Sequence, residues 1–216
     1  MKKKNSVGIW ITAIFAIGVA MYGFVLYGVL DGRESAFVDS KDGMELSDSW
    51  MTWLTVHAIS AAIALLIGWL QFVKRLRLKH LSLHRAIGML YTLAIAVGGV
   101  TGLYLSFYAS GGISGMLGFG LLAIVWLIST GIGVAAIIVR RDPAAHGKWM
   151  LRSYALAFAG VTLRAYLPLS MVLFGEEVFD IYYAVIAWIC WIPNLFVAEW
   201  LIRRKKRPTA RNTVSA

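Results

Sequence analysis

The sequence predicts an all-α membrane protein, a polytopic bundle of six transmembrane helices with both termini in the cytoplasm. Hydrophobic residues make up 59% of the 216 residues. Six apolar runs are long enough to cross about 30 Å of hydrocarbon, and basic residues are confined to alternate loops. One membrane domain, 1–207, therefore accounts for nearly the whole chain. The short polar tail, 208–216, is expected to be disordered.

The six runs are separated by polar or charged segments at which the helices are expected to end. The predicted spans are 7–30, 51–73, 86–108, 116–139, 153–174 and 181–202. Three local signals mark helix ends or bends. Asp142-Pro143 is typical of an N-cap followed by a first-turn proline, and Ser82 is the expected N-cap of the third helix. Pro168 and Pro193 are expected to bend the last two helices.

The net charge of +10 is explained by membrane topology rather than by nucleic-acid binding. Lys and Arg gather before the first span, in the second and fourth links, and in the tail, whereas the first and last links are acidic. Because positive loops stay on the cytoplasmic side, this pattern predicts that both termini are inside. The expected partner is the lipid bilayer, and we expect no nucleic acid.

Two histidines lie near the cytoplasmic ends of the third and fifth helices, where they share a depth. His84 and His146 would face each other as axial ligands of a b-type haem if these helices are neighbours. Arg85, Lys148 and Arg152 lie close to them in sequence and would pair with the haem propionates. The alternative is that both imidazoles are hydrated residues at the membrane surface.

A third histidine gives a different interpretation of the same region. His80 and His84 are four residues apart and share a helix face if the helix extends back that far. With His146 they would form a three-histidine site for zinc, iron or copper.

Arg164 is the basic residue placed deepest within an apolar run, where a charge is costly and suggests function. Counting about 1.5 Å per residue brings Arg164 to nearly the same depth as His57, in the outer half of the membrane. Together they would line an outward-facing cavity that holds a small anion or a quinone oxygen. The alternative is that Arg164 snorkels outward or caps backbone carbonyls near Pro168. Glu199 is expected to pair with Arg203 one helical turn later.

The sequence identifies no catalytic residue. It contains no Gly-rich phosphate loop, no Ser-His-Asp order and no CxxC pattern. An enzyme, a small transporter and an assembly factor all remain open.

Two segments resemble a known family. Leu83-His84-Arg85-Ala86-Ile87-Gly88-Met89-Leu90-Tyr91, and His146-Gly147-Lys148-Trp149-Met150-Leu151-Arg152-Ser153-Tyr154-Ala155-Leu156 followed by Val161-Thr162-Leu163-Arg164, look like the bacterial membrane family called domain of unknown function 2306. The resemblance covers about 53–169. It implies a multi-helix protein of the bacterial cytoplasmic membrane and names no activity.

The plan is also remotely similar to di-haem transmembrane cytochromes of the b561 kind. That likeness implies histidines on helices two to five, and His57, His84 and His146 match three of these positions. The fourth helix has no histidine, and Met116 is the one substitute near its start. The first interpretation is therefore an electron-transfer protein with one haem b. The second is a non-redox transporter or assembly factor with an anion site at Arg164 and His57, and the third is the three-histidine metal site.

Overall fold

The computed structural model describes residues 4–30, 32–33, 35, 38 and 47–206, which form helices and short connections throughout. The predicted tail, 208–216, lies outside the described residues. Six helical segments are long and apolar enough to cross a membrane: Gly8–Val29, Asp48–Phe72, Leu81–Ser106, Gly112–Ile138, Pro143–Phe174 and Phe179–Arg204. The predicted six-helix membrane fold is thus confirmed.

Four helices form the centre of the bundle. They are α3 (Asp48–Gly68), α5 (Leu81–Ser106), α6 (Gly112–Ile138) and α7 (Pro143–Ala157). Consecutive members of this set pack side by side, and α7 closes the ring against α3. The helices α5 and α7 therefore face each other across the ring, where the Tyr91 hydroxyl lies 2.9 Å from Ser153 Oγ.

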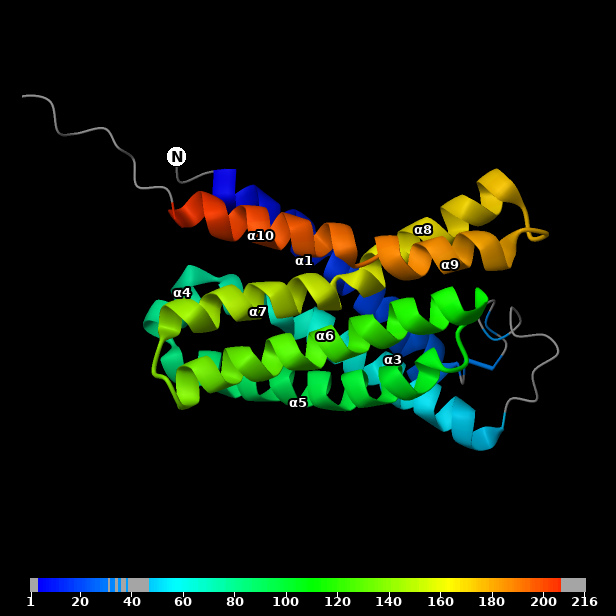
Figure 1. Cartoon of the computed structure of the whole chain (residues 1–216). Coiled ribbons are helices and arrows are strands. Elements are labelled where there is room, and N and C mark those ends of the chain that lie inside the picture. Colours follow the sequence, from blue (N-terminus) through cyan, green and yellow to red (C-terminus); the bar gives the residue numbers. More distant parts are fainter. Residues whose placement is uncertain (1–3, 31, 34, 36–37, 39–46, 207–216) are drawn as a thin grey trace, which may run out of the picture.

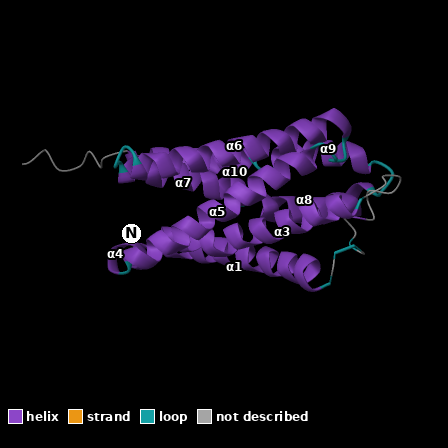
Figure 2. Cartoon of the chain, turned by 90° about the horizontal axis from the view of Figure 1, so that it is seen from below, coloured by secondary structure: helices purple, strands orange, loops and turns teal. Residues whose placement is uncertain are grey.

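The remaining helices surround this centre. The first span, α1 (Lys4–Phe24), continues into a π-helical turn, η1 (Val25–Val29), and packs on α3 and α8 (Ala159–Phe174). The last span consists of α9 (Phe179–Ile189), which packs on α6, and α10 (Ile192–Lys206), which packs on α7. Figure 2 shows α6, α7, α9 and α10 on one side of the bundle and α1, α3 and α8 on the other.

The two ends of the bundle differ in charge. At one end lie the start of α1, the end of α10 and the short helix α4 (Lys74–Lys79), which follows the turn η2 (Trp69–Phe72) (Figure 1). We call this the basic end, because it carries Lys74, Arg75, Arg77, Lys79, Arg140, Arg141, Arg203 and Arg204. The opposite end, where α8 meets α9 and where α3 begins, carries Asp48, Glu176, Glu177 and Asp180, and we call it the acidic end.

Of the two predicted N-cap residues, Asp142 is confirmed and Ser82 is wrong. Asp142 caps α7 by accepting hydrogen bonds from the backbone N–H groups of Ala144 and Ala145, both at 2.9 Å. In contrast, Ser82 lies inside α5, since that helix begins at Leu81 with His80 as its N-cap. The prediction for Ser82 was wrong because the preceding helix α4 ends at Lys79 and leaves no room for a longer loop.

The fifth and sixth spans are both interrupted within the bundle. The sixth breaks at Cys190 and Trp191, just before Pro193, whose ring cannot accommodate the carbonyl of residue i−4, Ile189. The fifth breaks at Phe158, ten residues before Pro168, which lies inside continuous α8. The Thr162 hydroxyl oxygen lies within hydrogen-bond distance of the carbonyls of Phe158 (3.3 Å) and Ala159 (3.1 Å). Such hydroxyl bonds to the preceding turn commonly bend helices.

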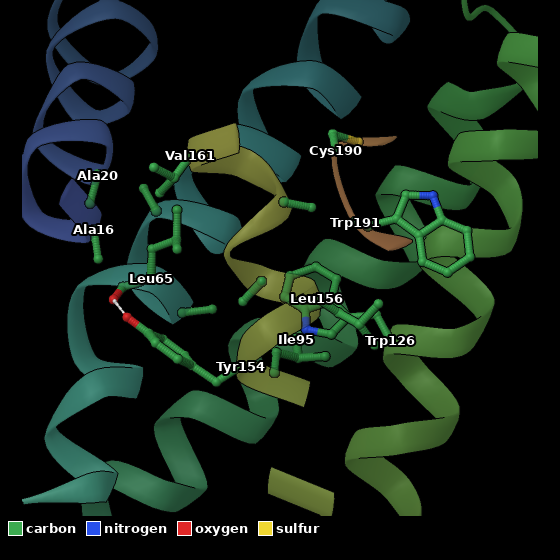
Figure 3. Packing of buried hydrophobic residues seen from close by; sticks show 14 of the residues in the cluster. Ala16, Ala20, Leu65, Ile95, Trp126, Tyr154, Leu156, Val161, Cys190 and Trp191 are labelled. Carbon is green, nitrogen blue, oxygen red and sulfur yellow. Dashed lines mark hydrogen bonds between the residues drawn. The ribbon is translucent and has the colours of Figure 1, made fainter. Parts of the chain in front are cut away.

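The buried core lies beside these interruptions, as Figure 3 shows. Ile95, Trp126, Leu156 and Tyr154 belong to one buried cluster, in which the Tyr154 hydroxyl donates to the Leu65 carbonyl at 3.3 Å. Large apolar side chains such as Val172 and Ile138 are exposed on the outside of the bundle. Exposed apolar residues of this kind are expected where helices face lipid.

Candidate functional site: a cavity in the acidic half of the bundle

A cavity of about 1140 Å³ lies among the helices in the half of the bundle toward the acidic end. Its wall comes from α1, η1, α3, α5, α6, α7, α8 and α9 and is mostly apolar. The volume is larger than the roughly 300–1,000 Å³ typical of small-molecule sites. His57 and Arg164, from α3 and α8, both lie on this wall, as does the acidic residue Glu176 at the end of α8.

The His57 ring is held against α5 by hydrogen bonding at Nδ1 and by the space that Gly102 leaves. Its Nδ1 lies 2.9 Å from the Gly98 carbonyl oxygen. A carbonyl can only accept, so Nδ1 carries the proton and Nε2 keeps its lone pair in the neutral ring. At Gly102 an added Cβ would lie 2.9 Å from His57 Cε1, so the ring needs glycine there. Gly102 therefore makes room for a polar ring at this place on α5.

The Arg164 guanidinium has few partners in the protein. One NH₂ group donates to the Gly160 carbonyl at 3.2 Å, and the guanidinium carbon lies 5.7 Å from the centre of the Tyr22 ring. Among the described residues, no carboxylate is within ion-pair distance of Arg164. A guanidinium has five N–H donors, so most of its hydrogen-bonding capacity remains available on the cavity wall.

Tyrosines complete the polar part of the wall. The π-helical turn η1 brings Tyr27 onto it, and α9 contributes Tyr182 and Tyr183. The Tyr182 side chain is 7% exposed, and its hydroxyl has no hydrogen-bond partner among the described residues. Buried hydroxyls are normally bonded, so this one is available to a polar group in the cavity.

The floor of the cavity lies where the two interrupted spans meet. Ala157, Ala159 and Gly160 line it from one interruption and Cys190 from the other. The Thr162 hydroxyl bonds to the Cys190 carbonyl, and Asn194 Nδ2 donates to the same carbonyl at 2.9 Å. Interrupted helices that line a cavity are a common feature of membrane transporters. Sequence reasoning missed this junction, although Pro193 and the polar pair Thr162 and Asn194 were visible signals.

His84 and His146 lie near the basic end, away from this cavity. They are on α5 and α7, the two helices that face each other across the central ring, and they are close enough to interact electrostatically. His146 Nδ1 lies 2.8 Å from the Gly133 carbonyl, so Nδ1 carries a proton, and in the neutral ring Nε2 keeps its lone pair. His84 Nδ1 is buried and has no hydrogen-bond partner among the described residues.

Arg85, Lys148 and Arg152, the residues expected to pair with haem propionates, differ in their contacts and exposure. Arg152 forms two hydrogen bonds with the Glu199 carboxylate, of 2.5 and 3.1 Å, and stacks on Trp149 at 4.4 Å. The sequence suggested Arg203 as the partner of Glu199 and did not predict this ion pair between α7 and α10. Arg85 is exposed and Lys148 is half-buried.

His80 is exposed at the junction of α4 and α5. Among the described residues, no three His, Cys, Asp or Glu side chains are grouped so as to hold a metal ion. The structure thus does not bring His80, His84 and His146 together as the three-histidine interpretation required, because His80 precedes the bundle while the other two face its interior side.

One comparison with known proteins gives a match. The sequence model of a family described as "Predicted membrane protein (DUF2306)" matches residues 54–202, which is well over half of the chain and reaches further than the 53–169 of the sequence resemblance. No curated protein and no solved structure matches significantly.

Proposed function

Because the chain belongs to this DUF2306 family of predicted membrane proteins, we propose that it is a ligand-binding membrane protein whose cavity holds a hydrophobic molecule with an anionic head group. Arg164 binds the anionic oxygens. His57 Nε2 accepts a hydrogen bond from a hydroxyl on the same ligand. The protein then acts as a small transporter or an assembly factor rather than as a redox protein.

The observation that carries this proposal is the charge of Arg164, which no carboxylate among the described residues neutralises. A guanidinium within a membrane span is expensive unless it has a partner, and no described carboxylate supplies one. Anionic groups with two oxygens match the planar fork of arginine better than any other ligand class. The unpartnered Tyr182 hydroxyl on the same wall supports a polar head group as well.

A thermal-stability measurement tests the proposal. We use dodecyl phosphate as the probe, added to protein purified in an uncharged maltoside detergent. Bound ligand should raise the apparent Tm of the wild type, because ligand that binds the folded state stabilises it. Arg164→Leu should weaken binding roughly 10- to 100-fold, as expected for the loss of charge-assisted hydrogen bonds.

Arg203→Leu is the matched control, since Arg203 is an exposed arginine at the basic end. It removes the same charge from the protein and should leave the stabilisation unchanged. If the wild type is not stabilised, or if both variants respond equally, the anion-site proposal is wrong.

In this proposal, the charges at the two ends of the bundle decide which side of the membrane the cavity faces. With the basic end in the cytoplasm of a bacterial inner membrane, both termini are inside and the cavity lies in the outer half. A quinone, whose carbonyl oxygens also accept hydrogen bonds from arginine, is the neutral alternative ligand. Decylubiquinone in place of dodecyl phosphate distinguishes the two.

A second candidate function is electron transfer by a b-type haem between His84 and His146. It is supported by the position of the two imidazoles, on helices that face each other across the centre of the bundle. The proton on His146 Nδ1 leaves Nε2 able to ligate iron. Against this, the cavity does not include either histidine, and Tyr91 and Ser153 fill the core two helical turns deeper. The haem itself would supply the redox chemistry.

A reduced-minus-oxidised absorption spectrum tests the haem candidate. Protein expressed with ample haem should show sharp b-type bands that His84→Ala and His146→Ala each remove. Bands that survive both substitutions, or a spectrum without bands, exclude this ligand pair.

A further inference from the structure

Part of the cavity wall is also part of the outer surface of the bundle. Gly18 and Tyr22 on α1, and Pro168 and Met171 on α8, line the cavity and are nevertheless exposed. Tyr22 is 54% and Met171 43% exposed. The wall is therefore incomplete between these two helices, and we call this place the α1–α8 opening, defined by these four residues.

The surface around the opening is one that faces lipid. Ile14 on α1 is 67% exposed and Val172 on α8 is 84% exposed. Both helices belong to segments that are long and apolar enough to cross a membrane. A molecule that passes through the α1–α8 opening thus comes from the bilayer and not from water.

Arg164 lies at the inner edge of this opening. Its guanidinium sits over the ring of Tyr22, one of the four residues that define the opening. A ligand with its anionic group on Arg164 therefore has a short path for an apolar chain to leave sideways between α1 and α8. The apolar wall and the large cavity volume suit such a chain.

The other route into the cavity is electrostatically unfavourable for an anion. Glu176 lines the cavity at the acidic end, and Glu177 follows it. Carboxylates at the mouth of a cleft lower the local concentration of soluble anions. Charge thus favours the lateral route over entry from water.

We infer that the ligand is a membrane lipid with an anionic head group, which enters sideways from the bilayer through the α1–α8 opening until its head group reaches Arg164. This inference rests on the proposed anion site and adds the class of ligand and its path. The lipid tail stays between α1 and α8 while the head group occupies the cavity.

Gly18 allows the opening to be closed without disturbing the fold. A Cβ at Gly18 would meet no atom within 4 Å, so a larger side chain occupies open space in the mouth. Gly131 on α6 offers a matched control, because it is exposed, does not line the cavity, and also has no atom within 4 Å of its Cβ. Both substitutions replace a residue of low helix propensity by a better one.

The experiment uses the full chain in phosphatidylcholine vesicles that contain a trace of phosphatidic acid with a diazirine in one acyl chain. After illumination, the lipid should label peptides from α1 and α8 around the opening. Gly18→Trp should lower that labelling roughly 10-fold, the change that 1.4 kcal/mol of lost binding free energy produces. Gly131→Trp should leave it unchanged, and phosphatidylcholine with the same diazirine chain should label these peptides weakly.

The outcomes separate this inference from the function on which it rests. If dodecyl phosphate stabilises the wild type but not Arg164→Leu, while lipid labelling is the same in Gly18→Trp and Gly131→Trp, the anion site stands and lateral entry is overturned. Equal labelling by the two head groups overturns the anionic-lipid class. If dodecyl phosphate gives no Arg164-dependent stabilisation, both conclusions fail.

Discussion

His57 illustrates how a few atoms of backbone decide the geometry of this site. Its ring fits against α5 because Gly102 has no side chain, and the Gly98 carbonyl fixes which ring nitrogen carries the proton. The sequence shows the glycines and the histidine, but not that they meet. They are about forty residues apart, and only the packing of α3 on α5 brings them together.

Gly102→Ala should therefore lower the stability of the protein. The added Cβ would lie 2.9 Å from the His57 ring, and overpacking of this kind typically costs about 1–3 kcal/mol. We expect a lower apparent Tm in detergent. In a His57→Ala background the penalty should disappear, because the clash is gone.

Gly131→Ala is the control for helix propensity alone, since no atom lies near its Cβ. It should be neutral or slightly stabilising. A similar loss of Tm for Gly102→Ala with and without His57 would show that the ring is not the cause.

At the scale of helices, sequence reasoning succeeded where the signal was local. The apolar runs and the Asp142-Pro143 start follow from a few adjacent residues, and the structure agrees with both. Helix interruptions were harder to predict. Pro193 marked one of them, whereas the break at Phe158 lies beside a threonine hydroxyl that contacts another span.

The partner of Glu199 shows the same limit. Spacing along one helix suggested Arg203, whereas the carboxylate pairs with Arg152 from α7. A residue on another helix cannot be found from spacing on its own helix. The sequence suggested that His57 and Arg164 line one cavity, but it could not show the rest of the wall, which combines short pieces of eight segments.

Glu199→Leu should destabilise the protein more than Arg203→Leu. The side chains of Arg152 and Glu199 are 21% and 34% exposed, so we expect roughly 1–3 kcal/mol, below the 3–5 kcal/mol measured for fully buried pairs. The measurement is the apparent Tm in detergent. Arg203→Leu should change stability by less than about 0.5 kcal/mol, as is usual at exposed sites.

The double variant Arg152→Met/Glu199→Leu should recover most of the loss, because no uncompensated charge remains. If Arg203→Leu and Glu199→Leu are equally harmful, the pairing across α7 and α10 is not the main interaction of this carboxylate.

For the whole molecule, the separation of charge between the two ends predicts how it sits in a membrane. The eight lysines and arginines of the basic end are expected to stay on the cytoplasmic side, because their transfer across the membrane is unfavourable. Cysteine labelling with a membrane-impermeant maleimide on intact cells tests this orientation. Glu177→Cys, at the acidic end, should react, and Arg140→Cys, at the basic end, should react only after the cells are opened.

The unmodified protein is the internal control, since Cys190 is fully buried and should not react in either state. Reaction of Arg140→Cys on intact cells would show that the orientation is the opposite one. The cavity would then lie in the cytoplasmic half of the membrane.

The hydroxyls of Tyr91, Ser153 and Thr130 in the centre of the bundle have a consequence for bioenergetics. Thr130 donates its proton to the Trp126 carbonyl at 2.8 Å, so Ser153 must donate to Thr130, and Tyr91 must donate to Ser153. This relay ends at an amide oxygen, which has no proton to pass on. These three hydroxyls therefore do not form a proton wire, although they lie at the centre of a bundle that is hollow in one half.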